Sequence, residues 1–252
     1  MPGKTNFSSR MHMLDALRGL CVVCMVVYHF LFNMSRIFHT GWGTFLYNFF
    51  TPAAPYVAGI FIFLCGISCR LSRSNFKRAL IILAAAALVT LVTASPFIDM
   101  YPIWFGILHL LGISVLIFAM TRPVLDMLWP ALGIFLCAAL FLITRQLYVG
   151  YLGIAPWAYT HVSWNMPQAL SLPLGVNVTA LTTPDYFPIL PWIFILLAGT
   201  YFGKWLKGGS KLLSRNPIPP LAFIGRRALI IYLLHQPVLY GAAWLVFRLI
   251  ND

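Results

Sequence analysis

The sequence predicts an all-α, polytopic membrane protein, a helical bundle with about seven transmembrane helices. Of its 252 residues, 61% are hydrophobic and only 9% are charged, whereas soluble domains carry about 25% charged residues. Apolar runs long enough to cross a hydrocarbon core of about 30 Å recur along the whole chain. Lys and Arg gather in the short segments between alternate runs. We therefore expect a single transmembrane domain over residues 1–252, embedded in a lipid bilayer.

Glycine, proline and charged residues separate the predicted spans. A polar segment over 70–78 follows the second span, Thr121-Arg-Pro123 ends the fourth, and residues 204–220 follow the sixth. Within the second span, Pro52 and Pro55 predict a helix break, because proline removes a backbone donor and clashes with the preceding turn. The predicted spans are 12–35, 44–69, 77–97, 102–121, 124–144, 185–206 and 226–249.

The basic residues predict a cytoplasmic N-terminus, because cytoplasmic loops carry an excess of Lys and Arg. The segments on the other side hold only Arg36, Arg145 and Arg248. This asymmetry explains the net charge of +12 without a nucleic-acid partner. The basic set on the predicted cytoplasmic side is Lys4, Arg10, Arg70, Arg73, Lys77, Arg78, Arg122, Lys204, Lys207, Lys211, Arg215, Arg226 and Arg227.

One connection, residues 146–184, is much longer than the others and is predicted to lie on the extracytoplasmic side of the membrane. It contains Trp157, Tyr159, His161 and Trp164. Two interpretations stay open. The connection can cover a site, as long loops often do, or it can lie in the membrane interface, where Trp and Tyr are favoured.

The first span carries Asp15, Arg18 and His29, and ionisable residues within a span indicate a functional site. His29 lies eleven residues beyond Arg18, which is about 16 Å along a helix axis. The predicted topology places Arg18 near the cytoplasmic face and His29 in the outer half. The alternative is structural: Asp15 and Arg18 cap the cytoplasmic end of the helix, and His29 packs against another helix.

His109 and Asp185 are predicted to lie at a depth similar to that of His29, since both enter the membrane from outside. Two imidazoles and a carboxylate can provide a general base and the partner that orients it. Each also has a structural interpretation: Asp185 can cap a helix N-terminus, and His109 can bond the backbone of a neighbouring helix.

Three further groups are candidates for the site. His39 lies in the outer loop after the first span, where it faces either the site or water. His235 and Gln236 precede Pro237, so they either contact substrate or satisfy the carbonyl that this proline frees. At the cytoplasmic side, the guanidinium groups of Arg18, Arg226 and Arg227 suit a phosphorylated donor.

The five cysteines all lie in apolar spans, where cysteine is usually a small packing residue. We therefore expect neither a disulfide framework nor a metal site.

The ordered motifs resemble those of the heparan-α-glucosaminide N-acetyltransferase catalytic-domain family, and in particular those of its small bacterial members. The first motif is Leu14-Asp-Ala-Leu-Arg-Gly19 leading to Tyr28-His-Phe30. The motifs that continue the resemblance are Phe61-Ile-Phe-Leu-Cys-Gly66, Phe105-Gly-Ile-Leu-His109, Asp185-Tyr-Phe-Pro-Ile-Leu-Pro-Trp192 and Ile231-Tyr-Leu-Leu-His-Gln-Pro237.

The resemblance implies a membrane acyltransferase, expected in a bacterial inner membrane and as a possible homo-oligomer. It would move an acetyl or other acyl group from cytoplasmic acyl-CoA to a hydroxyl or amine of a glycan or lipid-linked glycan outside, without a metal. In the lysosomal member a His precedes a Trp after the first span, and His39-Thr-Gly-Trp42 is similar to that loop. Related acyltransferases instead carry a His where His29 stands. The resemblance leaves either histidine as the base, or as the carrier of an acyl-histidine intermediate.

Three other functions stay open from the residues themselves. A transporter or flippase could use the histidines as a proton relay. A b-type haem protein could use paired axial ligands such as His29 and His109. A non-catalytic membrane scaffold would not need His29 at all.

Overall fold

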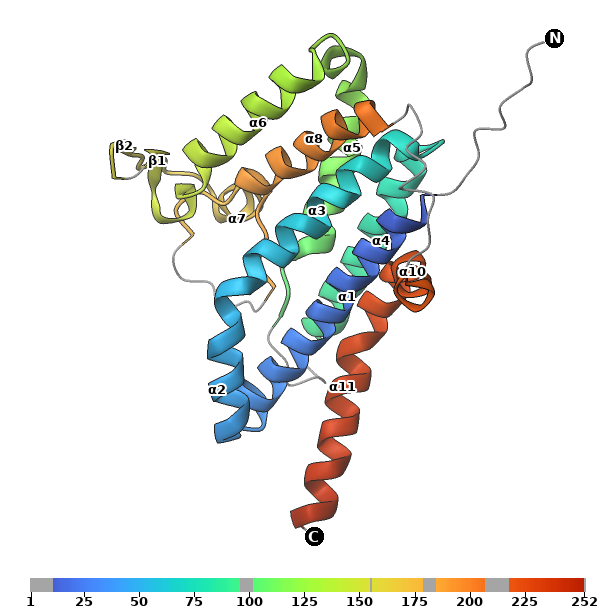
Figure 1. Cartoon of the computed structure of the whole chain (residues 1–252). Coiled ribbons are helices and arrows are strands. Elements are labelled where there is room, and N and C mark those ends of the chain that lie inside the picture. The colour runs from blue at the N-terminus through green and yellow to red at the C-terminus, as the bar shows by residue number, and fades with distance from the viewer. Residues whose placement is uncertain (1–10, 96–101, 155, 179–184, 207–217, 252) are drawn as a thin grey trace, which may run out of the picture. The chain divides into compact units, whose positions relative to one another are not determined.

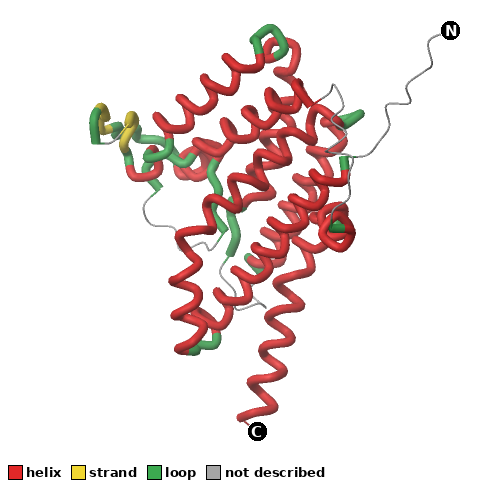
Figure 2. The backbone as a smooth tube through the Cα atoms, in the orientation of Figure 1, coloured by secondary structure: helices red, strands yellow, loops and turns green. Residues whose placement is uncertain are grey.

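The computed structural model describes residues 11–95, 102–154, 156–178, 185–206 and 218–251. Helices make up most of this part of the chain, and one small hairpin provides the strands (Figures 1 and 2). The helices are α1 (His12–Phe32), α2 (Gly41–Phe50), α3 (Ala54–Leu71), α4 (Asn75–Thr93), α5 (Ile107–Leu125), α6 (Pro130–Thr144), α7 (Gln168–Leu174), α8 (Ile189–Leu206), α10 (Pro219–Arg226) and α11 (Ala228–Asn251). The other elements are a π-helical turn η1 (Asn33–Ile37), the 3-10 turns η2 (Thr51–Ala53) and η3 (Leu147–Val149), and the strands β1 (Tyr151–Ile154) and β2 (Ala158–His161).

Within the described ranges, seven helical segments are long and apolar enough to cross a membrane, which confirms the predicted fold class. Their order along the chain also matches the seven predicted spans. The side of the membrane on which the N-terminus lies stays a prediction. The segments are His12–Ile37, Gly41–Leu71, Asn75–Thr93, Ile107–Leu125, Pro130–Val149, Ile189–Leu206 and Ala228–Leu249.

Proline interrupts the helix in the second predicted span but not at the end of the fourth. The break in the second span is confirmed, because α2 ends at Phe50 and the 3-10 turn η2 precedes α3. The predicted end at Pro123 is wrong, because α5 continues through this residue to Leu125. Pro123 lies in the last turn of α5, where it interrupts the hydrogen-bond ladder only once, and membrane helices tolerate such interruptions.

The chain divides into two compact units. Unit 1 contains residues 1–61 and 208–252, and unit 2 contains residues 62–207. The division falls within α3, so the first part of this helix belongs to unit 1 and its remainder to unit 2. The candidate residues are therefore described unit by unit.

In unit 1, α10 packs against the first turns of α1 with the two backbones in contact. A Cβ atom at Gly225 would overlap the carbonyl of Asp15, and one at Gly19 would overlap the carbonyl of Leu221. Small residues allow this kind of close approach, which is common where membrane helices associate. The two glycines thus bring the C-terminal end of α10 to the Asp15–Arg18 turn of α1.

Unit 2 packs α4 against α5, and α8 against both α5 and α6. Phe118, Leu110 and Val115 of α5 and Leu196 of α8 are fully buried. Close backbone approach recurs between α3 and α8, where a Cβ atom at Gly66 would overlap the carbonyl of Leu196. This core fixes the positions of the helix ends that carry the polar residues of unit 2.

Candidate active site

Two buried histidines meet in unit 1, His29 on α1 and His235 on α11. The Nε2 atom of His235 lies 3.3 Å from the Nδ1 atom of His29, and the ring centroids are 4.9 Å apart. Each residue is only 8% exposed. Both histidines were predicted from the sequence as candidate site residues, but nothing in the sequence indicated that they contact each other.

The backbone carbonyls around this pair assign a proton to each ring. The Nδ1 atom of His235 lies 2.6 Å from the carbonyl of Tyr232, so in the neutral ring Nδ1–H donates to that oxygen. Nε2 of His235 then carries a lone pair facing His29. The Nδ1 atom of His29 lies 3.1 Å from the carbonyl of Met25. Both neighbours of this nitrogen, the Met25 oxygen and Nε2 of His235, are therefore hydrogen-bond acceptors. Protonation of His29 on Nδ1 satisfies the network and leaves the lone pair of His29 on Nε2.

One helical turn beyond His29, a second polar contact joins the same two helices. The side-chain amide of Asn33 donates to Oε1 of Gln236 at 3.0 Å, and Asn33 is fully buried. Asn33 begins the π-helical turn η1, a rare conformation that is frequent at functional sites. Asn33 was not among the predicted site residues, although its spacing of four residues from His29 places the two on the same helix face.

Gln236 and His235 therefore bond across to α1, and neither contact reaches the carbonyl expected to be freed by Pro237. That carbonyl belongs to Leu233, four residues before the proline. His235 contacts the preceding carbonyl, that of Tyr232, and Gln236 accepts from Asn33. These contacts support a role in joining α11 to α1.

At the other end of α1, Asp15 and Arg18 form an ion pair with Nη1 and Oδ1 2.7 Å apart. The same Nη1 lies 3.5 Å from the carbonyl of Gly225 at the end of α10. The pair thus connects α1 to α10 where the two backbones touch. α1 is one continuous helix over Arg18 and His29. The two residues are therefore separated along the helix axis as expected.

Arg226 and Arg227 follow Gly225 directly, and both side chains are exposed. Their guanidinium groups lie over the ring of Phe223, with Cζ of Arg227 3.9 Å and Cζ of Arg226 5.9 Å from its centroid. Stacking of this kind leaves the N–H edges of a guanidinium available. Together with Arg18, unit 1 therefore gathers three guanidinium groups around the end of α10.

His39 lies in the turn between η1 and α2, outside the His29–His235 pair. The residue is exposed and has a φ of +52°, which is uncommon for a non-glycine residue. Thr40 closes the turn, with its amide donating to the carbonyl of Met34 at 2.8 Å. The side chain of His39 is thus accessible from outside the protein.

In unit 2, His109 stabilises the first turn of its own helix, α5. Its Nδ1 accepts from the backbone N–H of Gly106, the residue that caps α5, at 3.2 Å. Its Nε2 lies 3.3 Å from Oγ1 of Thr90, and that hydroxyl donates to the carbonyl of Ile103 at 2.7 Å. Both ring nitrogens are therefore engaged. The expected backbone contact exists, but it is made to His109's own helix terminus and not to a neighbouring helix.

Asp185 does not begin the sixth spanning helix as expected, because α8 starts at Ile189. The residue is 6% exposed, and it interacts electrostatically with His109. A Cβ atom at Gly106 would lie 2.9 Å from Oδ2 of Asp185, so the carboxylate sits beside the N-terminus of α5. A negative charge is favoured there by the helix dipole. The capping interpretation thus fits α5 better than α8.

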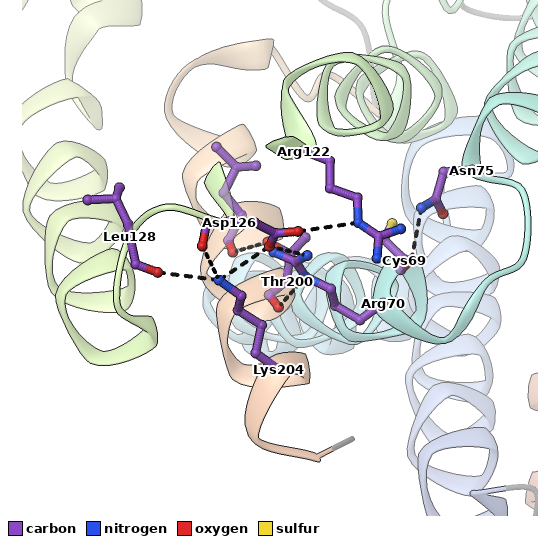
Figure 3. Close-up of polar contacts among 9 residues, drawn as sticks. Cys69, Arg70, Asn75, Arg122, Asp126, Leu128, Thr200 and Lys204 are labelled. Atoms are coloured by element: carbon purple, nitrogen blue, oxygen red, sulfur yellow. Dashed lines mark hydrogen bonds and ion pairs between the residues drawn. The ribbon is translucent and has the colours of Figure 1, made fainter. Parts of the chain in front are cut away.

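A cluster of charges that sequence reasoning missed surrounds Asp126, just after α5 (Figure 3). Its Oδ1 lies 2.6 Å from Nη1 of Arg70 and 3.2 Å from Nζ of Lys204, and its Oδ2 lies 3.5 Å from Nε of Arg122. Burial raises the pKa of Asp126, but the hydrogen bonds and charges of Arg70 and Lys204 outweigh it and hold the pKa below its ordinary value. The sequence assigned these cations to topology alone, although the only acidic residue between positions 100 and 184 was a signal for a partner.

This cluster joins helix ends, and most of its donors bond to the protein itself. Lys204 also donates to the carbonyls of Asp126 and Leu128 at 3.1 and 3.3 Å, so its three N–H groups are used. Arg70 donates from Nε to the carbonyl of Thr200, and its guanidinium lies 4.9 Å from the ring centroid of Phe118. The Arg70 side chain is 1% exposed. The contacts tie the C-terminal ends of α3, α5 and α8 together.

The expected convergence of His29, His109 and Asp185 stays a prediction, because His29 belongs to unit 1 and the other two to unit 2. Within unit 1 the structure brings His29, His235, Asn33 and Gln236 together. Among the described residues, no group of three or more His, Cys, Asp or Glu side chains is arranged to hold a metal ion.

Comparison with known proteins supports the family that the motifs resemble. No curated protein and no solved structure gives a match to this sequence. The model of one family, described as "Heparan-alpha-glucosaminide N-acetyltransferase, catalytic", matches residues 10–237. These bounds take in α1 with Asp15, Arg18 and His29, and they end just after His235 and Gln236. The chain therefore belongs to the heparan-α-glucosaminide N-acetyltransferase catalytic-domain family.

Proposed function

We propose that this protein is a membrane acyltransferase that moves an acetyl or other acyl group from acyl-CoA to an acceptor hydroxyl or amine. The family and the seven apolar helices support a membrane acetyltransferase. The donor is proposed to bind from the cytoplasm, and the acceptor to be a glycan or lipid-linked glycan on the other side of a bacterial inner membrane. The observation that carries the proposal is the buried His29–His235 pair.

His29 is the proposed general base, acting through Nε2. Donation from Nδ1 of His29 toward Met25 and His235 keeps the lone pair on the other nitrogen, as a base requires. The engaged nitrogens of His109 make it less suitable for this role. His109 and Asp185 are instead proposed to orient the reacting groups or to stabilise the oxyanion. His235 and Gln236 are proposed to line the acceptor side.

The reaction would proceed in two steps. Nε2 of His29 takes the proton of the acceptor O–H or N–H while the acceptor atom attacks the thioester carbonyl carbon. A tetrahedral oxyanion forms, and its collapse breaks the carbon–sulfur bond. The CoA sulfur leaves and receives the proton from the His29 imidazolium. The ester or amide product and free CoA account for every atom, and His29 returns to its neutral form.

The phosphates of the donor are proposed to bind at the guanidinium groups of Arg18, Arg226 and Arg227. These groups lie near the end of α10, and guanidinium forks match phosphate geometry. The distance along α1 to His29, about 16 Å, is compatible with a pantetheine arm that runs up the bundle to deliver the thioester.

The test is CoA release by the full chain in lipid nanodiscs, with acetyl-CoA and a panel of sugars and lipid-linked glycans. We expect His29→Ala to reduce turnover by roughly 10²–10⁴-fold, the usual contribution of a general base. His39→Ala is the matched control, since it removes an exposed histidine of the same unit, and it should retain turnover. Unchanged CoA release in His29→Ala would refute the assignment of the base. Full loss in His39→Ala alone would transfer it to His39.

A transporter or flippase is the second candidate, because two adjacent buried imidazoles could also relay a proton. It predicts substrate movement across a vesicle membrane without release of CoA. Absorbance of the purified chain would separately reveal a b-type haem by its Soret band.

A further inference from the structure

The hairpin formed by β1 and β2 has an unusual composition for a loop outside a membrane. Between Arg145 and Asp185 the sequence contains no Asp, Glu, Lys or Arg. Trp157 at the turn of the hairpin is 85% exposed, Tyr159 is 55% exposed, and Trp164 beyond β2 is 50% exposed. A connection in bulk water would normally expose charged side chains in place of large aromatic rings.

The hairpin is held at the end of a spanning segment. The segment Pro130–Val149 is one of the seven candidate spans, and β1 begins two residues later at Tyr151. The far end of the connection is bonded to the end of the same segment. The amides of Asn177 and Val178 donate to the carbonyls of Leu147 and Tyr148 at 3.2 and 2.8 Å. These bonds hold both ends of residues 150–176 at the depth where the span ends.

The two strands have little support from the rest of unit 2. β1 packs against α6, but all four residues of β2 are exposed. One face of the hairpin carries Tyr151, Tyr159 and His161. The ring of Tyr151 contacts the other two edge to face, with centroid distances of 5.4 Å to Tyr159 and 5.5 Å to His161. A two-stranded hairpin with this exposure is only marginally stable in water. Exposure of its aromatic side chains would be more favourable in a less polar environment than bulk water.

We propose that the β1–β2 hairpin lies in the membrane–water interface and anchors the long connection to lipid headgroups. Tyr and Trp favour this zone because an apolar ring and a polar N–H or O–H can each meet a suitable environment. The backbone of the paired strands is hydrogen-bonded, which lowers the cost of leaving water. The exposure extends over the turn and both ends of the hairpin, which fits a surrounding lipid layer better than a sugar stacked on one aromatic face.

The experiment measures the depth of a fluorophore on the full chain in nanodiscs. Trp157→Cys is labelled with an environment-sensitive dye in a Cys24→Ser background, since Cys24 is the one exposed cysteine and the other four are buried. Quenching is compared for aqueous iodide, headgroup nitroxides and mid-chain nitroxides. Arg73→Cys, in the polar turn before α4, provides the aqueous reference, and Leu140→Cys, in the middle of α6, provides the deep reference.

We expect a blue-shifted emission at position 157, with strongest quenching by headgroup nitroxides and weaker iodide quenching than at position 73. Iodide quenching equal to that at position 73, with no headgroup quenching, would overturn the proposal. Protection from iodide only after a glycan is added would also overturn it and assign the aromatic face to the acceptor. If Trp157→Cys does not fold, the label moves to the exposed Thr160 with the same criteria. None of these outcomes depends on acyltransferase activity.

Discussion

His29 and His235 are joined through their ring nitrogens, with Nδ1 of one 3.3 Å from Nε2 of the other. The chain of contacts continues from His235 to the carbonyl of Tyr232. His29 in turn contacts the carbonyl of Met25. Each histidine of the pair is therefore hydrogen-bonded to a backbone carbonyl. From this geometry we infer that His235 positions the ring of His29.

Replacement of His235 should reduce turnover less than removal of the proposed base. In His235→Phe the Met25 carbonyl still accepts from His29, so the ring keeps its proton arrangement but loses one of two contacts that orient it. We expect a loss smaller than the roughly 10²–10⁴-fold expected for His29→Ala. His235→Gln should retain more activity than His235→Phe, because an amide oxygen can accept from His29. The measurement is kcat at saturating donor. Equal activity of both variants and the wild type would remove the positioning role.

The proposed donor site makes a prediction for Arg227. Arg227→Gln should raise KM for acetyl-CoA by up to about fivefold with little change in kcat, since exposed charge pairs contribute about 0.2–1 kcal/mol. Arg248→Gln is a suitable control, because Arg248 also lies over an aromatic ring, that of Trp244, but is predicted on the opposite side of the membrane. A similar KM increase in both variants would indicate a general effect of charge and not a phosphate site.

Gly225 should be intolerant of any side chain. In Gly225→Ala the new methyl group would overlap the backbone of α1 at Asp15, so α10 must move away. We expect a destabilisation of about 1–3 kcal/mol, typical of overpacking. Gly241→Ala is the matched control, because a Cβ atom there has nothing within 4 Å and alanine favours the helix. Thermal unfolding of the purified variants in detergent checks the difference; equal melting temperatures would contradict the close contact.

Asp126 should stabilise unit 2 in a pH-dependent manner. Its pKa in the folded protein lies below the ordinary value of 3.8, so the unfolded chain binds the proton more readily than the folded chain. The stabilisation is complete above that ordinary value and is lost as the pH falls through the lower folded pKa.

Asp126→Asn should therefore lower the melting temperature at neutral pH, because Arg70 would keep its buried charge with a weaker partner. The difference between variant and wild type should narrow as the pH is taken below 3.8. Arg122→Gln provides the control, since Arg122 makes the longest contact of the cluster and its side chain is 40% exposed. A constant difference at every pH would contradict a role for the ionised carboxylate.

The sequence predicted the fold class and the order of the spans because apolar length is a local property. It also marked His29, His235 and Arg18 as candidate site residues, since ionisable groups stand out in an apolar segment, and their roles stay predictions. It could not pair His29 with His235 or Asn33 with Gln236, because helix pairing depends on long-range packing. Asp126 was missed for a similar reason: its partners Arg70 and Lys204 come from helices far apart in the chain. The end of α5 was misplaced because the local signal of Pro123 was overridden by its position in a last turn.

The continuity of α1 has a mechanical consequence. No break separates Arg18 from His29, so any rotation or axial shift imposed at the Arg18 end is transmitted to the histidine as rigid-body movement. The first departure from α-helical geometry comes after Phe32, at the π-helical turn η1. Engagement of a ligand at the Arg18 end of α1 would thus change the alignment of the His29 ring, and η1 is the first point along the chain where the helix geometry changes.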